Sequence, residues 1–451
     1  MLKHTLTCIL LIVSIGLYSQ LEGIYETDED AMATDTLINC LNDSTGLIPL
    51  TDMGTTYYYG VQGGLYQAGS NVLKGTHKKK GTDISYSIKP LDTSGHIDWE
   101  NGKVLVYGFG ASIASNAFNA FTDSLNDCDY EGMSECVTIR GMFVGGKDLN
   151  NMIDYDNPLF WNQLRDKMAL KGETHAQVQI LWILQHSDND TIADFEIYYN
   201  SVIEKYVTLM QILKDTFPNL KQVFLSGMHY TGYMSPDHKR YDAYAEPMAY
   251  WSNLVIKGLI QRQISGDHAL EYTGANIESA WIGWGPYFWA DGKNSREYDG
   301  LAWKCDQYRA DSTGGGFHLI DSSYGFGIEA AMLQTFMETN PVASIWFNNS
   351  TIWSDCADDT LKVSSTGSEE DKIRIFPNPV SNDFSILLPI INADQMMVYI
   401  YNELGVCVYR QFFENFDAPA IDIHHNLQSG IYIAEIFSET NKFSTKFTVS
   451  R

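Results

Sequence analysis

The chain has 451 residues, of which 44% are hydrophobic and 19% charged, and it carries a formal net charge of −26 with a pI of about 4.6. This composition is typical of folded globular proteins and excludes a largely disordered chain. The excess of acidic residues argues against nucleic acid or an anionic membrane surface as the main partner, and the length predicts two or three domains.

Residues 1–19 have the organisation of a secretory signal peptide. Lys3 and His4 give a positive start, residues 6–17 form an apolar core, and Ser19 offers a small residue at which cleavage is expected. The apolar run is too short for a transmembrane helix, and no later segment is long and apolar enough to cross a bilayer. We therefore expect the mature chain to be exported and soluble.

Six cysteines follow the signal peptide, and export permits disulfide bonds between them. Cys128 and Cys136 flank a short polar loop, and we expect them to pair. A second expected pair is Cys305 with Cys356. The cysteines lack the spacing of a zinc site, and we assign four scattered histidines to the surface or core rather than to a metal: His175, His186, His229 and His238.

Residues 20–102 are rich in glycine, tyrosine, threonine and aspartate and lack helical periodicity. We expect an irregular extension that packs on the main domain.

From residue 103 to 356, apolar strand-like runs alternate with helix-like runs. This alternation predicts right-handed βαβ units and a parallel sheet with helices on both faces. The expected strands are 104–109, 137–144, 178–184 and 223–226, and the expected helices are 115–125, 158–169, 197–217, 244–264 and 324–338.

Ser112 follows the first of these strands after Gly110 and Ala111. The carboxyl end of a parallel strand is where open α/β sheets bind ligands, so a serine hydroxyl there is a candidate nucleophile. A serine at this position is also a common helix N-cap, and the local pattern leaves both interpretations open.

Residues 357–371 are dominated by serine, threonine, glycine and acidic residues, as in a linker. Residues 372–451 contain short strand-like runs separated by turns, which predict a small all-β sandwich.

The tail resembles the C-terminal sorting domain of the bacterial type IX secretion system. The resemblance covers about the last 80 residues and rests on four ordered motifs, Phe-Pro-Asn-Pro-Val at 376–380, Tyr-Asn-Glu-Leu-Gly at 401–405, Leu-Gln-Ser-Gly-Ile-Tyr at 427–432 and Lys-Phe-Thr-Val at 446–449. It implies that residues 372–451 engage the secretion machinery and that the protein is secreted or displayed on the outer-membrane cell surface.

The main domain resembles SGNH (GDSL-like) hydrolases. The resemblance rests on Gly110-Ala111-Ser112 after the first strand, glycines 145 and 146 after the second, and Asp311 and His318 before the last helix. It implies a flavodoxin-like three-layer α/β/α domain in which Ser112, His318 and Asp311 are catalytic. In that scheme Ser112 attacks an ester, His318 transfers the proton and Asp311 orients the imidazole. The scheme needs no metal or organic cofactor.

Several positions depart from the SGNH pattern. The family's Asp-x-x-His is interrupted by three glycines, so Asp306 or Asp321 is an alternative acid. The oxyanion hole would use the N–H groups of Ser112 and Gly146, together with a side chain from Asn189 or Gln185. The candidates are thus Ser112, His318, Asp311, Gly146, Asn189 and Gln185.

Glu246 and Tyr250 lie in a tyrosine-rich stretch and are candidates for contacting a carbohydrate substrate, although core packing is an alternative role for them. The sequence thus favours an exported serine esterase that acts on ester groups of carbohydrates or glycoconjugates. The alternative is a noncatalytic surface glycan-binding protein that retains the SGNH fold.

Overall fold

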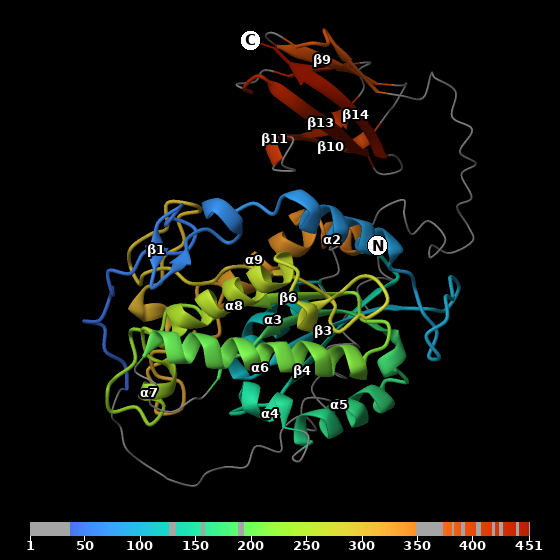
Figure 1. Ribbon diagram of the computed structural model, residues 1–451. Helices are drawn as coiled ribbons and strands as arrows, with labels where there is room; N and C mark the ends of the chain where they lie inside the picture. Colours follow the sequence, from blue (N-terminus) through green and yellow to red (C-terminus); the bar gives the residue numbers. More distant parts are fainter. Residues whose placement is uncertain are drawn as a thin grey trace, which may run out of the picture. The chain divides into compact units, whose positions relative to one another are not determined.

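The computed structural model describes residues 37–125, 132–154, 158–187 and 194–348, and in the C-terminal region residues 373–380, 383–388, 393–402, 407–416, 420–423, 427–438 and 442–450 (Figure 1). The expected signal peptide, the linker and Asn189 lie outside these residues.

A five-stranded parallel sheet forms the centre of the α/β domain. Its spatial order is β4-β3-β5-β6-β7, with β3 at Val104–Gly110, β4 at Val137–Phe143, β5 at Val178–Leu184, β6 at Gln222–Ser226 and β7 at Trp281–Trp284. In order of appearance along the chain this is 2-1-3-4-5, the order of flavodoxin-like folds. The predicted α/β class with a parallel sheet is therefore confirmed.

Four of the five strands were predicted from the sequence, and β7 was not. Strands of a parallel sheet are recognisable where they are covered on both faces. Every residue of β3 and of β5 is buried, so both strands are near-continuous apolar runs in the sequence. Strand β4 lies at the edge of the sheet and is only partly buried.

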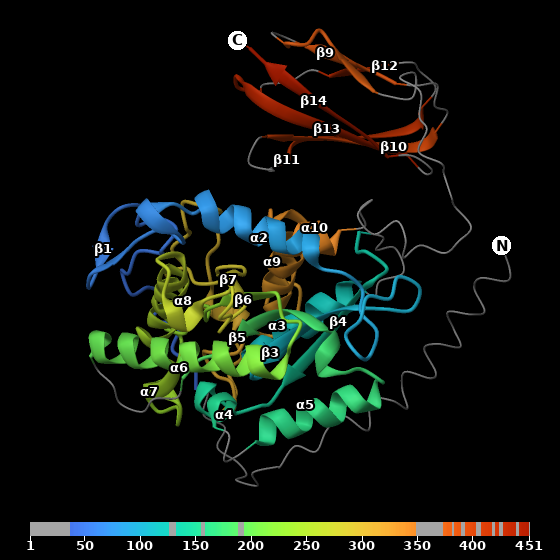
Figure 2. The same ribbon diagram turned by 45° about the vertical axis from the view of Figure 1, so that its right-hand side comes forward.

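Helices cover both faces of the sheet (Figure 2). Helix α3 packs against α9, and α6 packs against α4 and α8. The described helices are α2 (Gly75–Ser87), α3 (Ser112–Leu125), α4 (Leu149–Ile153), α5 (Leu159–Leu170), α6 (Phe195–Thr216), α7 (Tyr241–Tyr244), α8 (Met248–Ile264), α9 (Phe326–Thr339) and α10 (Ser344–Phe347).

Helix α2 lies in the stretch that we expected to be irregular. Its buried face consists of His77, Gly81 and Ser85, so it carries no apolar periodicity for a sequence to reveal. A Cβ atom on Gly81 would lie 2.7 Å from the Trp281 ring, which shows that the helix meets this ring closely. The helix expected at 244–264 begins only at Met248, directly after Pro247.

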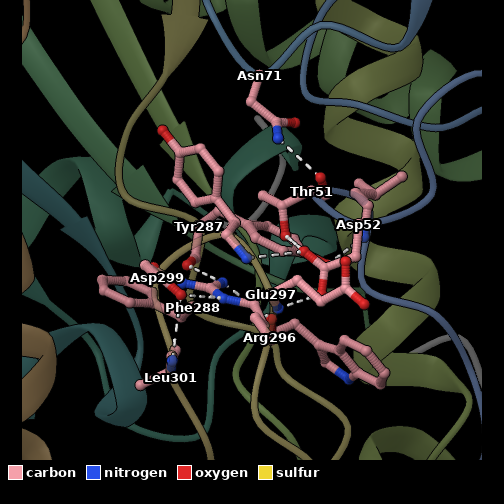
Figure 3. A network of polar contacts seen from close by, with 12 residues as sticks. Thr51, Asp52, Asn71, Tyr287, Phe288, Arg296, Glu297, Asp299 and Leu301 are labelled. Carbon is pink, nitrogen blue, oxygen red and sulfur yellow. Dashed lines mark hydrogen bonds and ion pairs between the residues drawn. The ribbon is translucent and has the colours of Figure 1, made fainter.

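The segment before β3 is tied to the loop after β7 by a polar network (Figure 3). The Arg296 guanidinium donates to the carbonyls of Tyr287 and Trp289 at 2.7 and 3.0 Å and pairs with Asp299. The Asp52 carboxylate accepts from the Glu297 N–H at 2.7 Å. Apolar residues of this early segment also belong to the main core, including Leu50, Met53 and Leu73.

A disulfide links Cys40 to Cys305, which are separated by 265 positions in the sequence and have Cα atoms 5.4 Å apart. The expected pairing of Cys305 with Cys356 is therefore wrong, because the fold brings a cysteine from far away in the sequence against Cys305. Cys136 is also disulfide-bonded, while its expected partner Cys128 lies outside the described residues.

Two short strands, β1 (Tyr57–Tyr58) and β2 (Val61–Gln62), form a hairpin whose surroundings are strained. Among the described residues, Tyr59 and Ala68 are the non-glycine residues with positive φ, at 44° and 55°. An L-residue in this left-handed region costs roughly 1–2 kcal/mol.

We expect Ala68→Gly to raise the free energy of unfolding by about 0.5–1 kcal/mol, since glycine relieves the strain but adds entropy to the unfolded chain. Urea denaturation followed by tryptophan fluorescence measures the change. All ten tryptophans precede residue 372, so this signal reports on the α/β domain alone. A destabilised variant would show that Ala68 is not strained.

The C-terminal region has its own core between two antiparallel sheets. One sheet has the order β11-β10-β13-β14 and the other β12-β9-β8. Buried side chains from both sheets form a separate cluster, in which the Phe384 and Phe447 rings lie 4.9 Å apart. The strands are β8 (Arg374–Phe376), β9 (Phe384–Leu387), β10 (Ala393–Asn402), β11 (Cys407–Phe416), β12 (Ala420–Ile423), β13 (Gly430–Ser438) and β14 (Lys442–Val449).

Candidate active site

Gly110 shapes the turn between β3 and α3. Its φ is 155°, and a Cβ atom there would lie 2.2 Å from the Leu184 carbonyl oxygen of the neighbouring strand β5. Only glycine fits this approach, which lets α3 begin at Ser112 directly above the strand. Ser112 thus stands at the carboxyl edge between β3 and β5, where the strand order reverses and flavodoxin-like folds bind ligands.

His318 meets Ser112 across 206 residues of sequence. The Ser112 Oγ lies 2.8 Å from the His318 Nε2, within the reach of a nucleophile and its base. The backbone around His318 is fixed by two hydrogen bonds, from the His318 N–H to the Gly314 carbonyl and from the Arg309 N–H to the His318 carbonyl.

His318 is 8% exposed. Burial, with a smaller contribution from the Arg309 guanidinium, lowers the pKa of His318 to about 3. The imidazole is therefore neutral at pH 7, which is the state that accepts a proton from a serine hydroxyl.

Asp311 does not bond to His318. Its Oδ1 accepts from the Thr313 N–H, the Thr313 hydroxyl and the Gly314 N–H, and its Oδ2 accepts from Arg309. Burial raises the pKa of Asp311, but the Thr313 and Arg309 contacts outweigh it and bring the pKa to about 2. The carboxylate is consequently ionised and engaged within its own loop.

The His318 Nδ1 is buried and has no hydrogen-bond partner among the described residues. A Cβ atom on Gly314 would lie 2.7 Å from this nitrogen, so the glycine backbone closes over it. The alternative acid Asp306 accepts from the Tyr324 hydroxyl at 3.3 Å, and no hydrogen bond from His318 reaches Asp306 or Asp321. The described part of the chain therefore holds a serine–histidine pair without a bonded acid.

The oxyanion-hole candidates among the described residues, Ser112, Gly146 and Gln185, lie at the same edge of the sheet. The first N–H groups of α3 have no partner within the helix, and the helix dipole adds positive potential at Ser112. Gly146, with φ 67°, follows β4, and a Cβ atom on it would lie 3.4 Å from the Arg240 guanidinium. Gln185 is buried, with its amide 3.4 Å from the Lys147 carbonyl and from the Met152 sulfur.

The Glu246 and Tyr250 side chains make hydrogen bonds within the protein. The Glu246 carboxylate accepts from the N–H groups of Thr231 and Tyr250 and from the Trp289 indole, and burial raises the pKa of Glu246 to about 7. The Tyr250 hydroxyl donates to the Ile48 carbonyl at 2.9 Å. These contacts fix the start of α8 against neighbouring loops.

A buried histidine–glutamate pair, His229 with Glu329, supports the loop that carries His318. His229 Nδ1 lies 2.8 Å from the Glu329 carboxylate on α9, and its Nε2 lies 2.8 Å from the Phe317 carbonyl. Both side chains are 1% exposed. Burial lowers the pKa of His229, but Glu329 reverses this effect and the net pKa is raised. Both ring nitrogens lie beside hydrogen-bond acceptors. His229 therefore donates from both nitrogens, as an imidazolium does.

Sequence reasoning did not find this pair. His229 follows β6 by three residues, at the same sheet edge as Ser112, and that position was the available signal. Glu329 stands among apolar residues of α9 and gave no signal of its own.

The described residues contain no group of three histidine, cysteine or acidic side chains placed to hold a metal ion. Within the same residues, none of the helices combines the length and the apolar character that a bilayer crossing requires.

Residues 374–450 match the family of secretion system C-terminal sorting domains. The sorting domain predicted from the tail motifs is therefore confirmed. It implies recognition by the type IX secretion machinery and a cell-surface or extracellular destination.

Two characterised relatives share short stretches with this chain. An endo-acting ulvan lyase of Formosa agariphila is 29% identical over 139 residues, which is 29% of this chain and 26% of that protein. The ulvan lyase NLR42 of Nonlabens ulvanivorans is 34% identical over 93 residues, or 20% of this chain and 16% of that protein. The chain thus spans about a quarter of the length of the first relative and about a sixth of the length of the second.

Similarity to solved structures is weak. An immunoglobulin-like β-sandwich protein of Bacteroides vulgatus has a TM-score of 0.15 at 19% identity, covering 17% of this chain and 81% of that one. An endo-β-1,4-mannanase of Cellulomonas fimi has a TM-score of 0.15 at 11% identity, covering 69% and 54%. The resemblance of the main domain to SGNH hydrolases stays a prediction.

Proposed function

We propose that this protein is an exported carbohydrate-active enzyme. The sorting domain supports export. The short similarity to two ulvan lyases supports a carbohydrate substrate.

We infer that the reaction is hydrolysis of an ester group on the carbohydrate, and the contact between Ser112 and His318 is the observation that carries this inference. Ser112 Oγ attacks the acyl carbon while its proton passes to His318 Nε2. The oxyanion of the tetrahedral intermediate accepts hydrogen bonds from the Ser112 and Gly146 N–H groups. Collapse expels the sugar alkoxide, which takes the proton from Nε2, and water then releases the acid from Ser112 by the same route.

In this proposal His318 acts without a bonded acid. Asp311 acts at a distance, through the charge it places near His318 and through the Thr313-Gly314 turn that it holds. The His229–Glu329 pair holds the Phe317 carbonyl and so positions the next residue, His318.

A fluorophosphonate probe tests the nucleophile directly. We expect the folded full-length protein to be labelled on Ser112, with labelling abolished in Ser112→Ala. Ser115→Ala is the matched control, since Ser115 lies one helical turn further along α3, and it should label normally. Absence of labelling in the wild type would contradict the serine mechanism.

The pH profile should reflect the buried imidazole. An ordinary histidine becomes protonated as the pH falls below about 6.5, and it can then no longer act as a base. With a folded pKa of about 3, His318 stays neutral at moderately acidic pH. We expect kcat/KM for an aryl acetate to show no decline between pH 7.5 and pH 5. An acidic limb with an apparent pKa of 6–7 would show that the imidazole titrates normally.

The unpartnered His318 Nδ1 favours a second candidate, a surface protein that binds glycans without turnover. Nothing in the described residues fixes the tautomer in which Nε2 accepts the serine proton. Glycan binding that persists in Ser112→Ala, with no hydrolysis of acetylated sugars by the wild type, would favour this candidate over the enzyme.

A further inference from the structure

A cavity of about 540 Å³ lies between the β1–β2 hairpin and helices α6 and α8. It shares no lining residue with the Ser112–His318 site. Its lining combines the turn after β1, residues 67–68, the first turns of α6 and the second half of α8. Six of its lining residues are Tyr59, Gln67, Ala68, Phe195, Asn200 and Lys257.

Aromatic rings form one side of this cavity. Tyr59 packs against Phe195 with ring centroids 5.5 Å apart, yet it is 77% exposed. Tyr199 lines the same wall from the next turn of α6. An exposed aromatic ring beside a cavity offers a flat apolar face to a ligand.

Neutral amide groups form the polar part of the lining. Gln62, Gln67, Asn200 and Gln261 all line the cavity. Within the described residues, the amides of Gln67 and Asn200 make no hydrogen bond and remain available to a ligand. Each amide both donates and accepts, which suits the hydroxyl groups of a sugar.

Backbone strain is concentrated at this cavity. The two described non-glycine residues with positive φ, Tyr59 and Ala68, both line it. Such strain persists where the surrounding structure fixes it, and it gathers at ligand sites. Tyr59 lies in the turn of this hairpin, and its ring is exposed at the cavity.

The charge of the cavity selects among ligands. The Lys257 ammonium donates to the carbonyls of Gly63, Gly64 and Tyr66, so its three protons are used within the protein. Glu196 adds an exposed negative charge at the rim. The described lining residues therefore leave no free cation to receive a carboxylate or sulfate.

We propose that this cavity binds a neutral oligosaccharide, with the Tyr59 ring stacked on a sugar face and Gln67 and Asn200 bonded to hydroxyl groups. The choice of a carbohydrate rests on the proposed function, but the site acts in binding and not in the chemistry at Ser112. The cavity would hold one part of a polysaccharide chain while the Ser112–His318 site acts on another part.

Isothermal titration of the full-length protein tests this proposal, with cellohexaose, mannohexaose and xylohexaose as neutral probes and hexagalacturonate as the acidic comparator. We expect at least one neutral hexasaccharide to bind more tightly than hexagalacturonate. Tyr59→Ala should weaken its Kd about tenfold through loss of the aromatic face. Asn200→Ala, at an exposed helix position that tolerates alanine, should weaken it about threefold to tenfold.

Tyr86→Ala is the matched control, because Tyr86 is an exposed tyrosine on α2 away from the cavity lining, and it should bind as the wild type does. Ser112→Ala should also bind normally, while Tyr59→Ala should still hydrolyse p-nitrophenyl acetate, so failure of one proposal leaves the other measurable. Binding of none of the neutral probes, tighter binding of hexagalacturonate, or unchanged binding in both cavity variants would overturn the proposal.

Discussion

Replacing His318 by glutamine is expected to lower kcat/KM for an aryl acetate by about 10³-fold, within the 10²–10⁴ range of general base catalysis. Glutamine has similar length and polarity but cannot take the proton of Ser112 Oγ. Steady-state kinetics on folded protein measures the loss. Residual activity within tenfold of the wild type would mean that Ser112 is activated by another group or is not the nucleophile.

Asp311→Asn separates a serine–histidine pair from a triad. Asparagine keeps an oxygen that can accept the three bonds now made to Oδ1, and it loses the ion pair with Arg309. Because Asp311 makes no bond to His318, we expect kcat/KM to change less than about tenfold. A loss near 10⁴-fold, the effect of this change in a serine protease triad, would show that Asp311 is the catalytic acid after all.

Removing the Glu329 side chain is expected to destabilise the α/β domain strongly. Glu329→Ala leaves the His229 imidazolium buried without its carboxylate, and breaking one partner of a buried pair costs about 3–5 kcal/mol. Urea denaturation monitored by tryptophan fluorescence measures the decrease in the free energy of unfolding.

Glu338→Ala serves as the control for this change, since Glu338 lies in the last turns of the same helix and is only partly buried. It should cost less than about 1 kcal/mol, as surface positions usually do. Equal decreases in the free energy of unfolding for the two variants would show that the His229–Glu329 pair does not stabilise the folded domain.

Strands β3 and β5 were predictable because they are covered on both faces and therefore read as apolar runs. The predicted strand 178–184 coincides with β5, and the predicted strand 104–109 ends one residue before β3 does. Helix α2 was not predictable, because its buried face is made of histidine, glycine and serine and it is held by contact with Trp281.

The candidate site was predictable in part. Ser112 stood out because it follows the first strand, and His318 because the SGNH resemblance places a histidine before the last helix. The structure brings the two side chains to 2.8 Å. The predicted contact between Asp311 and His318 is absent, because Asp311 bonds to Thr313 and Gly314 of its own loop. Hydrogen bonds inside a glycine-rich loop depend on backbone angles that residue spacing does not specify.

By itself, then, the sequence determined the parallel α/β class, the order of its main elements and the sorting domain at the end of the chain. These properties depend on local hydrophobic pattern and on short ordered motifs. Only the tertiary structure decided that Cys305 pairs with Cys40, that His318 Nδ1 has no partner among the described residues, and that His229 meets Glu329. Each of these depends on which distant segments pack together, and that choice is made by the whole core at once.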